Sequence, residues 1–303
     1  MKPLTLLFAL LAPFLHTEER DLSHGIVFCT YNVRNYVGED QAATEHRAKP
    51  KSEAEIEALI AVIREISPDV LGVCEMGSAA MFEDFKARLA KAGLGYVDSE
   101  YLQAEDLDRH VALVSRFPIV ARDSQKNVLF SVSGKEEGMR RGILDVTVQI
   151  TPEYRLRCVG VHLKSKLPTP DGEALIRRHE AAKLRDHLDA ILKDEPEVNL
   201  LCYGDCNDTR NEPVFGAITG VKGTPGYMAD LWASDSMGDR WTYHWHFADE
   251  YSRIDYLFVS PGLWPEVQLK TATVYRSADW EKASDHRAVY VTIKAVEKAR
   301  KKR

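Results

Sequence analysis

The sequence has no excess of glycine, of proline or of positive charge, and each absence removes a class of protein. Its 303 residues include 18 Gly and 13 Pro, 45% are hydrophobic and 28% are charged. This composition is typical of a globular chain and excludes a disordered, collagen-like or coiled-coil protein. Lys and Arg number 40 against 46 Asp and Glu. This balance argues against sequence-independent binding of duplex nucleic acid, because surface cations supply most of that affinity.

The five cysteines include no C-x-x-C pair, so neither a zinc site nor a redox motif is indicated by their spacing. Four of them lie inside apolar runs and are expected to behave as small buried hydrophobes, with a disulfide as the less favoured alternative. The cysteines are Cys29, Cys74, Cys158, Cys202 and Cys206.

The ends of the chain are expected to differ from its body. Lys2 and the apolar run Leu4–Leu15 have the pattern of a signal peptide, although no A-x-A cleavage site follows. Residues 1–20 are therefore predicted to be a signal peptide, or else an apolar N-terminal segment. A signal peptide predicts a secreted or periplasmic protein, and the protein is otherwise expected to be cytoplasmic. Residues 21–296 contain no repeat, linker or further apolar run of membrane-spanning length. They are predicted to form a single domain, followed by a basic tail at 297–303.

From residue 26 onward, short β-rich runs alternate with helical patterns. Three segments have the apolar spacing of amphipathic helices, at 53–66, 79–92 and 173–192. Hairpin-like neighbours between 96 and 162, with strand–helix–strand units before and after them, predict an α/β fold of two packed sheets with helices on their outer faces. Strands are expected at 26–31, 69–74, 96–101, 111–115, 142–150, 155–162, 199–203, 240–244, 254–259, 271–275 and 288–293.

Polar side chains follow or interrupt these apolar runs at six places. Each one alone is more typical of a turn or a helix cap. Because unpaired buried carboxylates are costly, several of them in one fold are expected to converge on a cation or on one another. Their oxygens suit Mg²⁺ or Mn²⁺, and the accompanying imidazoles suit phosphate, which together predict hydrolysis of a phosphate ester. The six places are Asn32, Glu75, His162, Asp205 with Asn207, Asp255, and Asp285 with His286.

The motifs around these residues resemble those of the endonuclease/exonuclease/phosphatase superfamily, which has the DNase-I-like fold. They occur in the family's order between residues 26 and 293, and Gly-Asp-x-Asn-Asp and Ser-Asp-His are the most specific. The resemblance implies a four-layered α/β sandwich whose active site lies at one end of the two sheets. The motifs are Thr30-Tyr31-Asn32-Val33-Arg34, Cys74-Glu75, Val161-His162-Leu163-Lys164, Gly204-Asp205-Cys206-Asn207-Asp208, Arg253-Ile254-Asp255-Tyr256 and Ser284-Asp285-His286-Arg287.

The resemblance also implies roles for these residues. Glu75 would be the principal Mg²⁺ ligand, with Asn32 beside it and Asp285 near the metal, and Mn²⁺ is the alternative ion. Arg34 stands where the family's abasic-site endonucleases have an acidic residue, which argues against DNA repair. The Cys206 side chain replaces the usual Phe or Leu of its motif, a change of volume and not of chemistry.

The same resemblance assigns the chemical step. Asp205 would position or deprotonate the attacking water, and Asn207 would donate to a phosphoryl oxygen in the transition state. His286, oriented by Asp255, would contact the scissile phosphate, and His162 would be a second donor to it. In parts of the superfamily the residue matching His286 is instead the general base, so both assignments stay open.

Two further features bear on the substrate. Arg109 and Arg141 precede strands and are candidates for binding substrate phosphate, the alternative being surface ion pairs. The aromatic stretch Trp241–Phe247 has the composition of a surface that stacks a base or a sugar or meets lipid, the alternative being packing between sheets and loops.

Four functions are therefore compared. A metal-dependent phosphodiesterase or phosphatase that acts on small organic phosphates, nucleotides or lipid headgroups fits the acidic composition best. An exported DNA or RNA endonuclease or exonuclease is the closest alternative. A dedicated lipid-headgroup phosphodiesterase and a non-catalytic binding module are less favoured. In each case a phosphate ester is the expected partner, and the oligomeric state is not predicted.

Overall fold

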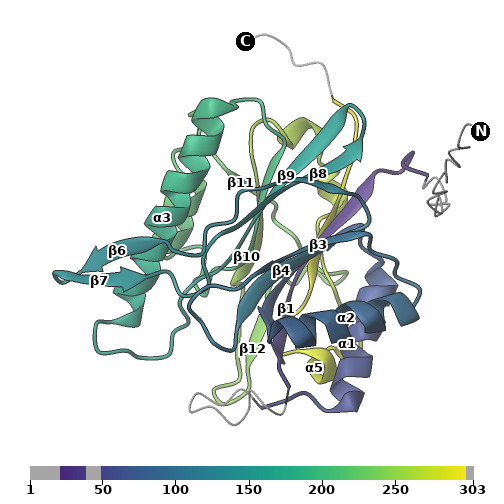
Figure 1. The fold of residues 1–303 in the computed structure, drawn as a ribbon, viewed down its shortest axis with the longest axis horizontal. Helices are drawn as coiled ribbons and strands as arrows, with labels where there is room; N and C mark the ends of the chain where they lie inside the picture. Colours follow the sequence, from purple (N-terminus) through teal and green to yellow (C-terminus); the bar gives the residue numbers. More distant parts are fainter. Residues whose placement is uncertain (1–20, 39–48, 298–303) are drawn as a thin grey trace, which may run out of the picture.

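Two mixed six-stranded sheets form the centre of the computed structural model, which describes residues 21–38 and 49–297 (Figure 1). The first sheet has the order β15-β16-β1-β2-β4-β3, and the second has the order β11-β14-β10-β9-β8-β5. In the first sheet the strands are β15 (Thr273–Val274), β16 (Val289–Ile293), β1 (Ile26–Tyr36), β2 (Val70–Met76), β4 (His110–Ser115) and β3 (Asp98–Leu102). In the second they are β11 (Ala229–Asp230), β14 (Asp255–Val259), β10 (Leu200–Asp205), β9 (Tyr154–His162), β8 (Leu144–Thr151) and β5 (Ile119–Arg122).

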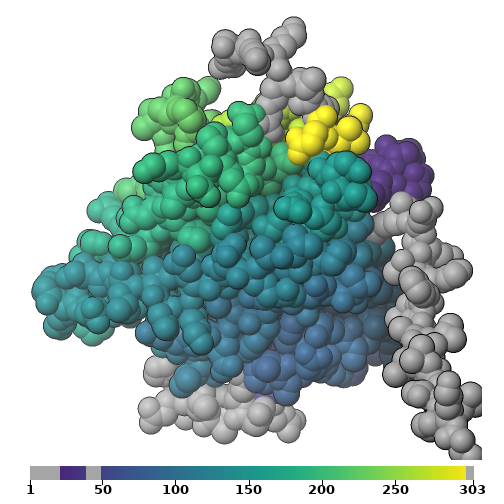
Figure 2. All heavy atoms as spheres, turned by 45° about the horizontal axis from the view of Figure 1, so that its top comes forward, coloured from purple at the N-terminus to yellow at the C-terminus, as the bar shows by residue number. Residues whose placement is uncertain are grey.

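Within residues 21–38 and 49–297, two hairpins and five α-helices surround the sheets. The β6–β7 hairpin packs on α3 through stacked rings of Phe130 and His179, and it projects from the body of the molecule (Figures 1 and 2). The hairpin strands are β6 (Leu129–Val132) with β7 (Lys135–Gly138), and β12 (Tyr243–Trp245) with β13 (Glu250–Ser252). The helices are α1 (Glu53–Ile66), α2 (Ala79–Lys91), α3 (Glu173–Asp194), α4 (Pro213–Thr219) and α5 (Trp280–Ala283), with 3₁₀ turns at Trp264–Glu266 and Leu269–Thr271.

Strand alternation explains why the molecule has four layers. Successive side chains point to opposite faces of a strand, so Phe28 of β1 packs between the sheets while Cys29 and Tyr31 pack against α1 and α2. On the other side, Cys202 of β10 packs with Leu184 under α3. The order helix, sheet, sheet, helix confirms the α/β sandwich expected from the sequence.

Local sequence places the helix ends. Ser52 caps α1 by accepting from Glu55 N–H, and the Glu55 carboxylate accepts in return from Ser52 N–H. This capping box satisfies two backbone donors that the first helical turn leaves free. At the other end Ser67 adopts a left-handed conformation (φ 48°), and Pro68 follows it. The predicted helix at 53–66 is confirmed to the residue.

Tyr203 of β10 joins the two sheets across the core. Its ring packs against Phe28 at 5.1 Å between centroids and is fully buried. The space for the ring exists because Gly72 on β2 and Gly160 on β9 have no side chain. A Cβ at Gly72 would lie 2.0 Å from the ring, and one at Gly160 would lie 2.5 Å from it.

The expected elements match with some corrections. The strand expected at 240–244 is wrong in position, since only Tyr243–Trp245 is a strand, paired with β13 and not with either large sheet. Only Thr273–Val274 of the strand expected at 271–275 is extended in the sheet. Asn32 and Asp205 lie within β1 and β10 and not after them. Sequence analysis missed β5, β6, β7, β11 and β13, because these strands are short or polar and lack the apolar alternation that predicts a strand.

Several other expectations concern the ends and the cysteines. The proposed signal peptide at 1–20 and residues 298–303 of the basic tail lie outside the described residues. In the described part of the chain, no helix has the length and apolar composition to cross a bilayer. All five cysteines lie in described segments, and each is buried with a free thiol, which confirms their expected role as small core residues.

Candidate active site

Strand register brings the polar strand ends to one end of the two sheets. Asp205 at the end of β10 pairs with His162 of parallel β9 on one side and with Asp255 of antiparallel β14 on the other. In the other sheet, Asn32 lies opposite Cys74, the residue before Glu75. Residues far apart in sequence therefore meet because their strands are neighbours.

Asn32 links two carboxylates from different sheets. Its Nδ2 donates to Asp205 Oδ2 at 3.0 Å and to Glu75 Oε1 at 3.3 Å, while its Oδ1 accepts from Arg34 N–H at 3.0 Å. The second Glu75 oxygen accepts from Asn35 N–H at 3.0 Å. Glu75 has a left-handed backbone (φ 64°), a strained conformation for a non-glycine residue that is concentrated at functional sites. In this conformation the Glu75 carboxylate lies between Asn32 Nδ2 and Asn35 N–H.

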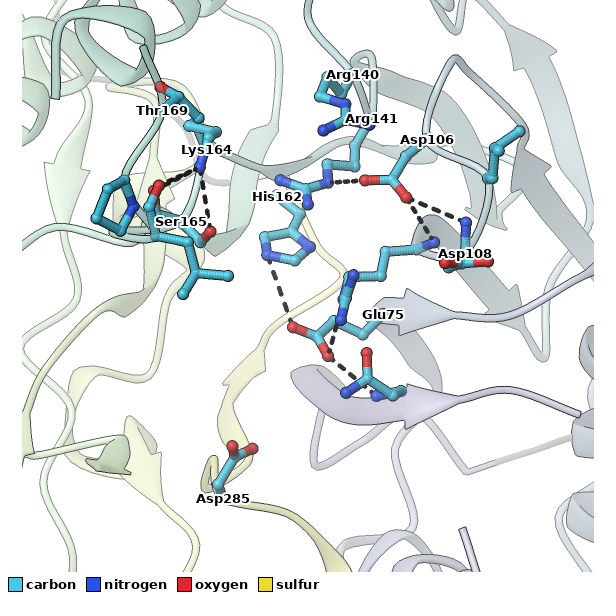
Figure 3. A pocket seen from close by; sticks show the side chains of 15 residues that line it. Glu75, Asp106, Asp108, Arg140, Arg141, His162, Lys164, Ser165, Thr169 and Asp285 are labelled. Carbon is cyan, nitrogen blue, oxygen red and sulfur yellow. Dashed lines mark hydrogen bonds and ion pairs between the residues drawn. The ribbon is translucent and has the colours of Figure 1, made fainter. Parts of the chain in front are cut away.

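His162 faces the same two carboxylates. Its Nε2 lies 3.6 Å from Asp205 Oδ2 and 3.9 Å from Glu75 Oε1, and the side chain is almost fully buried (Figure 3). Burial, helped by the nearby cations of Arg141 and Arg109, holds the pKa of His162 well below its usual value. A neutral imidazole with its Nε2 toward carboxylates is a hydrogen-bond donor at that nitrogen.

His286 has the opposite electrostatic environment. Its Nδ1 lies 2.8 Å from Asp255 Oδ2, and the same oxygen accepts from the Thr242 hydroxyl at 2.6 Å. Burial by itself lowers the pKa of His286, but the Asp255 charge and hydrogen bond outweigh it and raise the pKa to about 10. His286 is therefore an imidazolium at neutral pH. Its Nε2 points toward Asp205 Oδ2, at 3.8 Å.

Asp205 is the centre of this arrangement. Burial and the nearby charge of Asp255 raise the pKa of Asp205 to about 7, and the His286 imidazolium opposes that rise. Its Oδ1 accepts from Asn207 N–H at 2.8 Å. A carboxylate with this pKa can accept a proton near neutral pH, as a general base requires.

Asn207 contacts Asp205 through its backbone N–H, and Asp285 directly precedes His286. Asn207 has a left-handed backbone (φ 50°), and its Nδ2 donates to Leu163 O at 3.0 Å. Asp285 reaches the cavity from the loop after α5 (Figure 3). Its carboxylate is 3.8 Å from Arg34 Nε.

A cavity of about 690 Å³ opens beside Glu75 and His162 and has a cationic wall (Figure 3). Arg141 is buried in this wall, where its Nε donates to Asp106 Oδ2 at 2.8 Å. Arg109 Nε lies 3.8 Å from Glu75 Oε2. The structure thus places both arginines at the cavity, and the ion pair that Arg141 forms with Asp106 is buried and not on the surface.

Three residues that support the site belong to no sequence motif, and sequence analysis did not identify them. Asn35 supplies a backbone N–H to Glu75, Thr242 holds Asp255, and Asp106 orients Arg141. The left-handed backbone of Asn35 (φ 53°) fits the known tolerance of Asn for that conformation. No sequence signal marks Thr242 or Asp106, because their partners are far away in the chain.

The donor set fits a hard divalent cation. Glu75, Asp205 and Asp285 offer oxygens, which Mg²⁺ and Mn²⁺ prefer. A cation beside Asp205 would also offset the repulsion between Asp205 and Asp255 that raises the pKa of Asp205. Asp205, Asp255 and His286 have ligand atoms within 4.8 Å of one another, although the Nδ1 of His286 is engaged with Asp255.

Sequence comparison with protein families gives a match over most of the chain. The family model described as Endonuclease/Exonuclease/phosphatase family matches residues 29–286. No curated protein has significant sequence similarity to the chain.

Solved structures share the fold at low identity. Truncated TDP2 from Caenorhabditis elegans is 18% identical, with a TM-score of 0.59 over 89% of this chain and 98% of that one. Sphingomyelinase C from Streptomyces griseocarneus is 16% identical, with a TM-score of 0.62 over 89% and 99%. The human Nocturnin catalytic domain with bound sulfate is 16% identical, with a TM-score of 0.60 over 88% and 93%. At these identities the likeness concerns the fold.

Proposed function

The chain belongs to the endonuclease/exonuclease/phosphatase family, and from that premise we propose that it is a divalent-metal-dependent phosphoesterase. It hydrolyses a phosphodiester or phosphomonoester bond by attack of water. The observation that carries the proposal is the position of Asp205 between two imidazole rings, with His162 Nε2 at 3.6 Å and His286 Nε2 at 3.8 Å from its Oδ2. Glu75 completes this setting beside a cavity with a cationic wall.

The metal site is proposed at Glu75, with Asn32 and Asp285 nearby and Asp205 adjacent. Bound there, Mg²⁺ or Mn²⁺ would supply Lewis-acid stabilisation of charge on the phosphoryl oxygens. In the observed orientation the Asn32 amide nitrogen faces the carboxylates, so Asn32 would hold Glu75 and Asp205 in place.

The protein's own groups divide the remaining work. Asp205 would accept the proton of the attacking water, because it lies between the two imidazole rings and a nearby cation would keep its carboxylate ionised. His286 is protonated at neutral pH and would donate to the phosphoryl group, which favours Asp205 over His286 as the base. His162 and Asn207 would be further donors, and such preorganised donors stabilise the charge that develops in the transition state.

The cavity wall is proposed to bind the substrate phosphate. Arg141 is held by Asp106 and so presents its guanidinium in one orientation. Arg109 lies beside Glu75 on the same wall. Guanidinium groups suit phosphate because they offer paired donors in a planar arrangement.

The test compares three substrates under one set of conditions. We expect Mg²⁺-dependent hydrolysis of bis-p-nitrophenyl phosphate or p-nitrophenyl phosphate, abolished by EDTA and by His286→Ala. Plasmid DNA is the third substrate. Cleavage of plasmid alone, with an activity that falls steeply as salt rises, would instead establish the nuclease. Inactivity on all three substrates with either metal would contradict the proposal and favour a binding module.

The Asp255–His286 pair makes a pH-dependent prediction. Asp255→Asn removes the charge that keeps His286 protonated up to about pH 10. The alkaline limb of the kcat profile is expected to move down toward the ordinary histidine pKa of about 6.5, and kcat at pH 8 to fall by about 10-fold or more. Stopped assays from pH 5 to 11 measure both effects. A uniform loss of kcat with an unmoved alkaline limb would show that Asp255 does not act through the protonation of His286.

A lipid headgroup is a second candidate substrate, favoured by the β12–β13 hairpin. Phe247 in its turn is 95% exposed, and Trp245 and Tyr251 are about half exposed. Tyr243 on the same hairpin contacts the His286 ring at 4.7 Å between centroids. Exposed aromatic rings beside a catalytic centre are typical of a surface that inserts into a lipid interface.

Removing the exposed rings tests this candidate. The double variant Trp245→Ala and Phe247→Ala is expected to lose about 10-fold or more of its activity on phospholipid vesicles, because each inserted ring contributes roughly 1.5–3 kcal/mol. Its activity on the soluble p-nitrophenyl ester serves as the control and should stay within twofold of the parent. Equal losses on both substrates would contradict a role in lipid docking.

A further inference from the structure

A second cluster of ligating side chains lies at the junction of the β12–β13 hairpin and α5. His244 is the middle residue of β12, and His246 is the first residue after that strand. Glu281 comes from α5. The ligand atoms of these three residues all lie within 4.8 Å of one another. None of the three is among the described residues that line the cavity at Glu75.

The two ring nitrogens of His244 face different carboxylates, Nε2 that of Asp249 and Nδ1 that of Glu281. Its Nε2 lies 3.1 Å from Asp249 Oδ1, so that nitrogen carries the proton and donates it. Its Nδ1 is buried, lies 3.3 Å from Glu281 Oε1 and makes no hydrogen bond with any described residue. In this tautomer a lone pair points at a carboxylate, which is unfavourable unless a cation lies between them.

Packing holds the His244 ring in this orientation. The ring stacks on Tyr251 at 4.2 Å between centroids with an interplanar angle of 3°, and the His246 ring lies 4.4 Å away. His244 is 6% exposed, whereas His246 and Glu281 are exposed to solvent. The cluster therefore combines one fixed, buried ligand with two that a solvent ion can reach.

We propose that His244 Nδ1, His246 and the Glu281 carboxylate bind a divalent transition metal ion of the Zn²⁺ type. Two imidazoles and one carboxylate are a ligand set that suits Zn²⁺, with water in the fourth position. Imidazole nitrogens also distinguish this site from the oxygen donors at Glu75. Asp249 has the position of an outer carboxylate that orients a metal-binding histidine.

An ion at this site joins the hairpin to the segment that carries the catalytic histidine. Glu281 is four residues before Asp285 and five before His286. On the hairpin side, His244 N–H donates to Asp285 O at 3.0 Å. The bound ion thus fastens α5 to β12 and limits local opening of the Trp280–His286 segment. This role does not depend on which phosphate ester is hydrolysed.

Calorimetric titration with Zn²⁺ tests the site on the full chain. The protein is first treated with a chelator and then saturated with Mg²⁺, so that Zn²⁺ competes little for the oxygen donors at Glu75. His246→Ala and Glu281→Gln are expected to weaken Zn²⁺ binding by at least about tenfold. His24→Ala and Asp279→Asn alter exposed residues outside the cluster and serve as matched controls, with the parent's affinity expected. Equal affinity in the parent and the two cluster variants would overturn the proposal.

Two readouts that do not depend on activity complete the test. Zn²⁺ is expected to raise the Tm of the parent and of the controls but not that of Glu281→Gln. Hydrogen exchange in residues 280–287 is expected to slow on adding Zn²⁺ to the parent and to the controls, but not on adding it to Glu281→Gln. If the parent binds no Zn²⁺, the proposal is wrong. Zn²⁺ protection of 280–287 that persists in Glu281→Gln would also overturn it, because the ion would then be bound elsewhere.

Discussion

Replacing Asp205 by Asn, or His286 by Ala, is expected to lower kcat by roughly 10²- to 10⁴-fold. Asn keeps the size of Asp205 and can still accept from Asn207 N–H, but it cannot take a proton from water. Ala at position 286 removes the imidazolium that Asp255 holds at 2.8 Å. Both changes act on groups that are almost fully buried, and Asp205 lies 3.6 Å from His162, which lines the cavity. The loss should therefore appear in kcat more than in KM.

Steady-state kinetics on the best p-nitrophenyl ester measure this effect. Asp186→Asn and His24→Ala are matched controls at exposed positions and are expected to retain the parent's kcat. Circular dichroism and the Tm show whether each variant is folded. Activity within tenfold of the parent in either folded active-site variant would refute the assignment of that residue.

Gly72→Ala is expected to destabilise the fold by about 3 kcal/mol or more, at the upper end of what overpacking costs. The new Cβ would lie 2.0 Å from the Tyr203 ring, which is enclosed between the sheets and cannot move aside. Urea denaturation of the purified variant measures the change in the free energy of unfolding. Gly95→Ala is the matched control, because no described atom lies within 4 Å of its added Cβ.

Substitutions of Tyr203 test whether its ring causes the loss of stability in Gly72→Ala. Its hydroxyl is buried and makes no hydrogen bond to any described residue, so Tyr203→Phe is expected to leave the stability within about 0.5 kcal/mol or to raise it. In the Gly72→Ala background, Tyr203→Leu should recover part of the lost stability by removing the ring that the Cβ meets. A coupling energy near zero in this double-mutant cycle would show that the ring contact is not the cause.

The catalytic strands were predictable because their signal is local. Each is an apolar run that stops at one polar residue, as in β10 with Asp205 and β9 with His162. An acidic or imidazole group at the end of a buried strand has few roles other than binding a partner, so the pattern is informative. The β6–β7 hairpin lacked such a signal, because it alternates weakly and is stabilised by packing on α3.

The supporting contacts at the site were not predictable in the same way. Thr242 holds Asp255 from 13 positions away, and Asp106 orients Arg141 from 35 positions away. Neither residue type is unusual for a surface loop. Their role exists only because a loop returns to the site after the sheets have formed, and no pattern in the sequence specifies that path.

The sequence alone determined the α/β class and the family. It also identified the acidic, amide and imidazole groups that meet at one end of the sheets. Those features depend on local periodicity and on short motifs. Only the tertiary structure decided the protonation states of the two histidines, since burial beside Arg141 keeps His162 neutral while Asp255 keeps His286 charged. It likewise decided that His244 faces Glu281. Distances between charges and their exposure to water determine these properties, and both arise from packing between segments far apart in the chain.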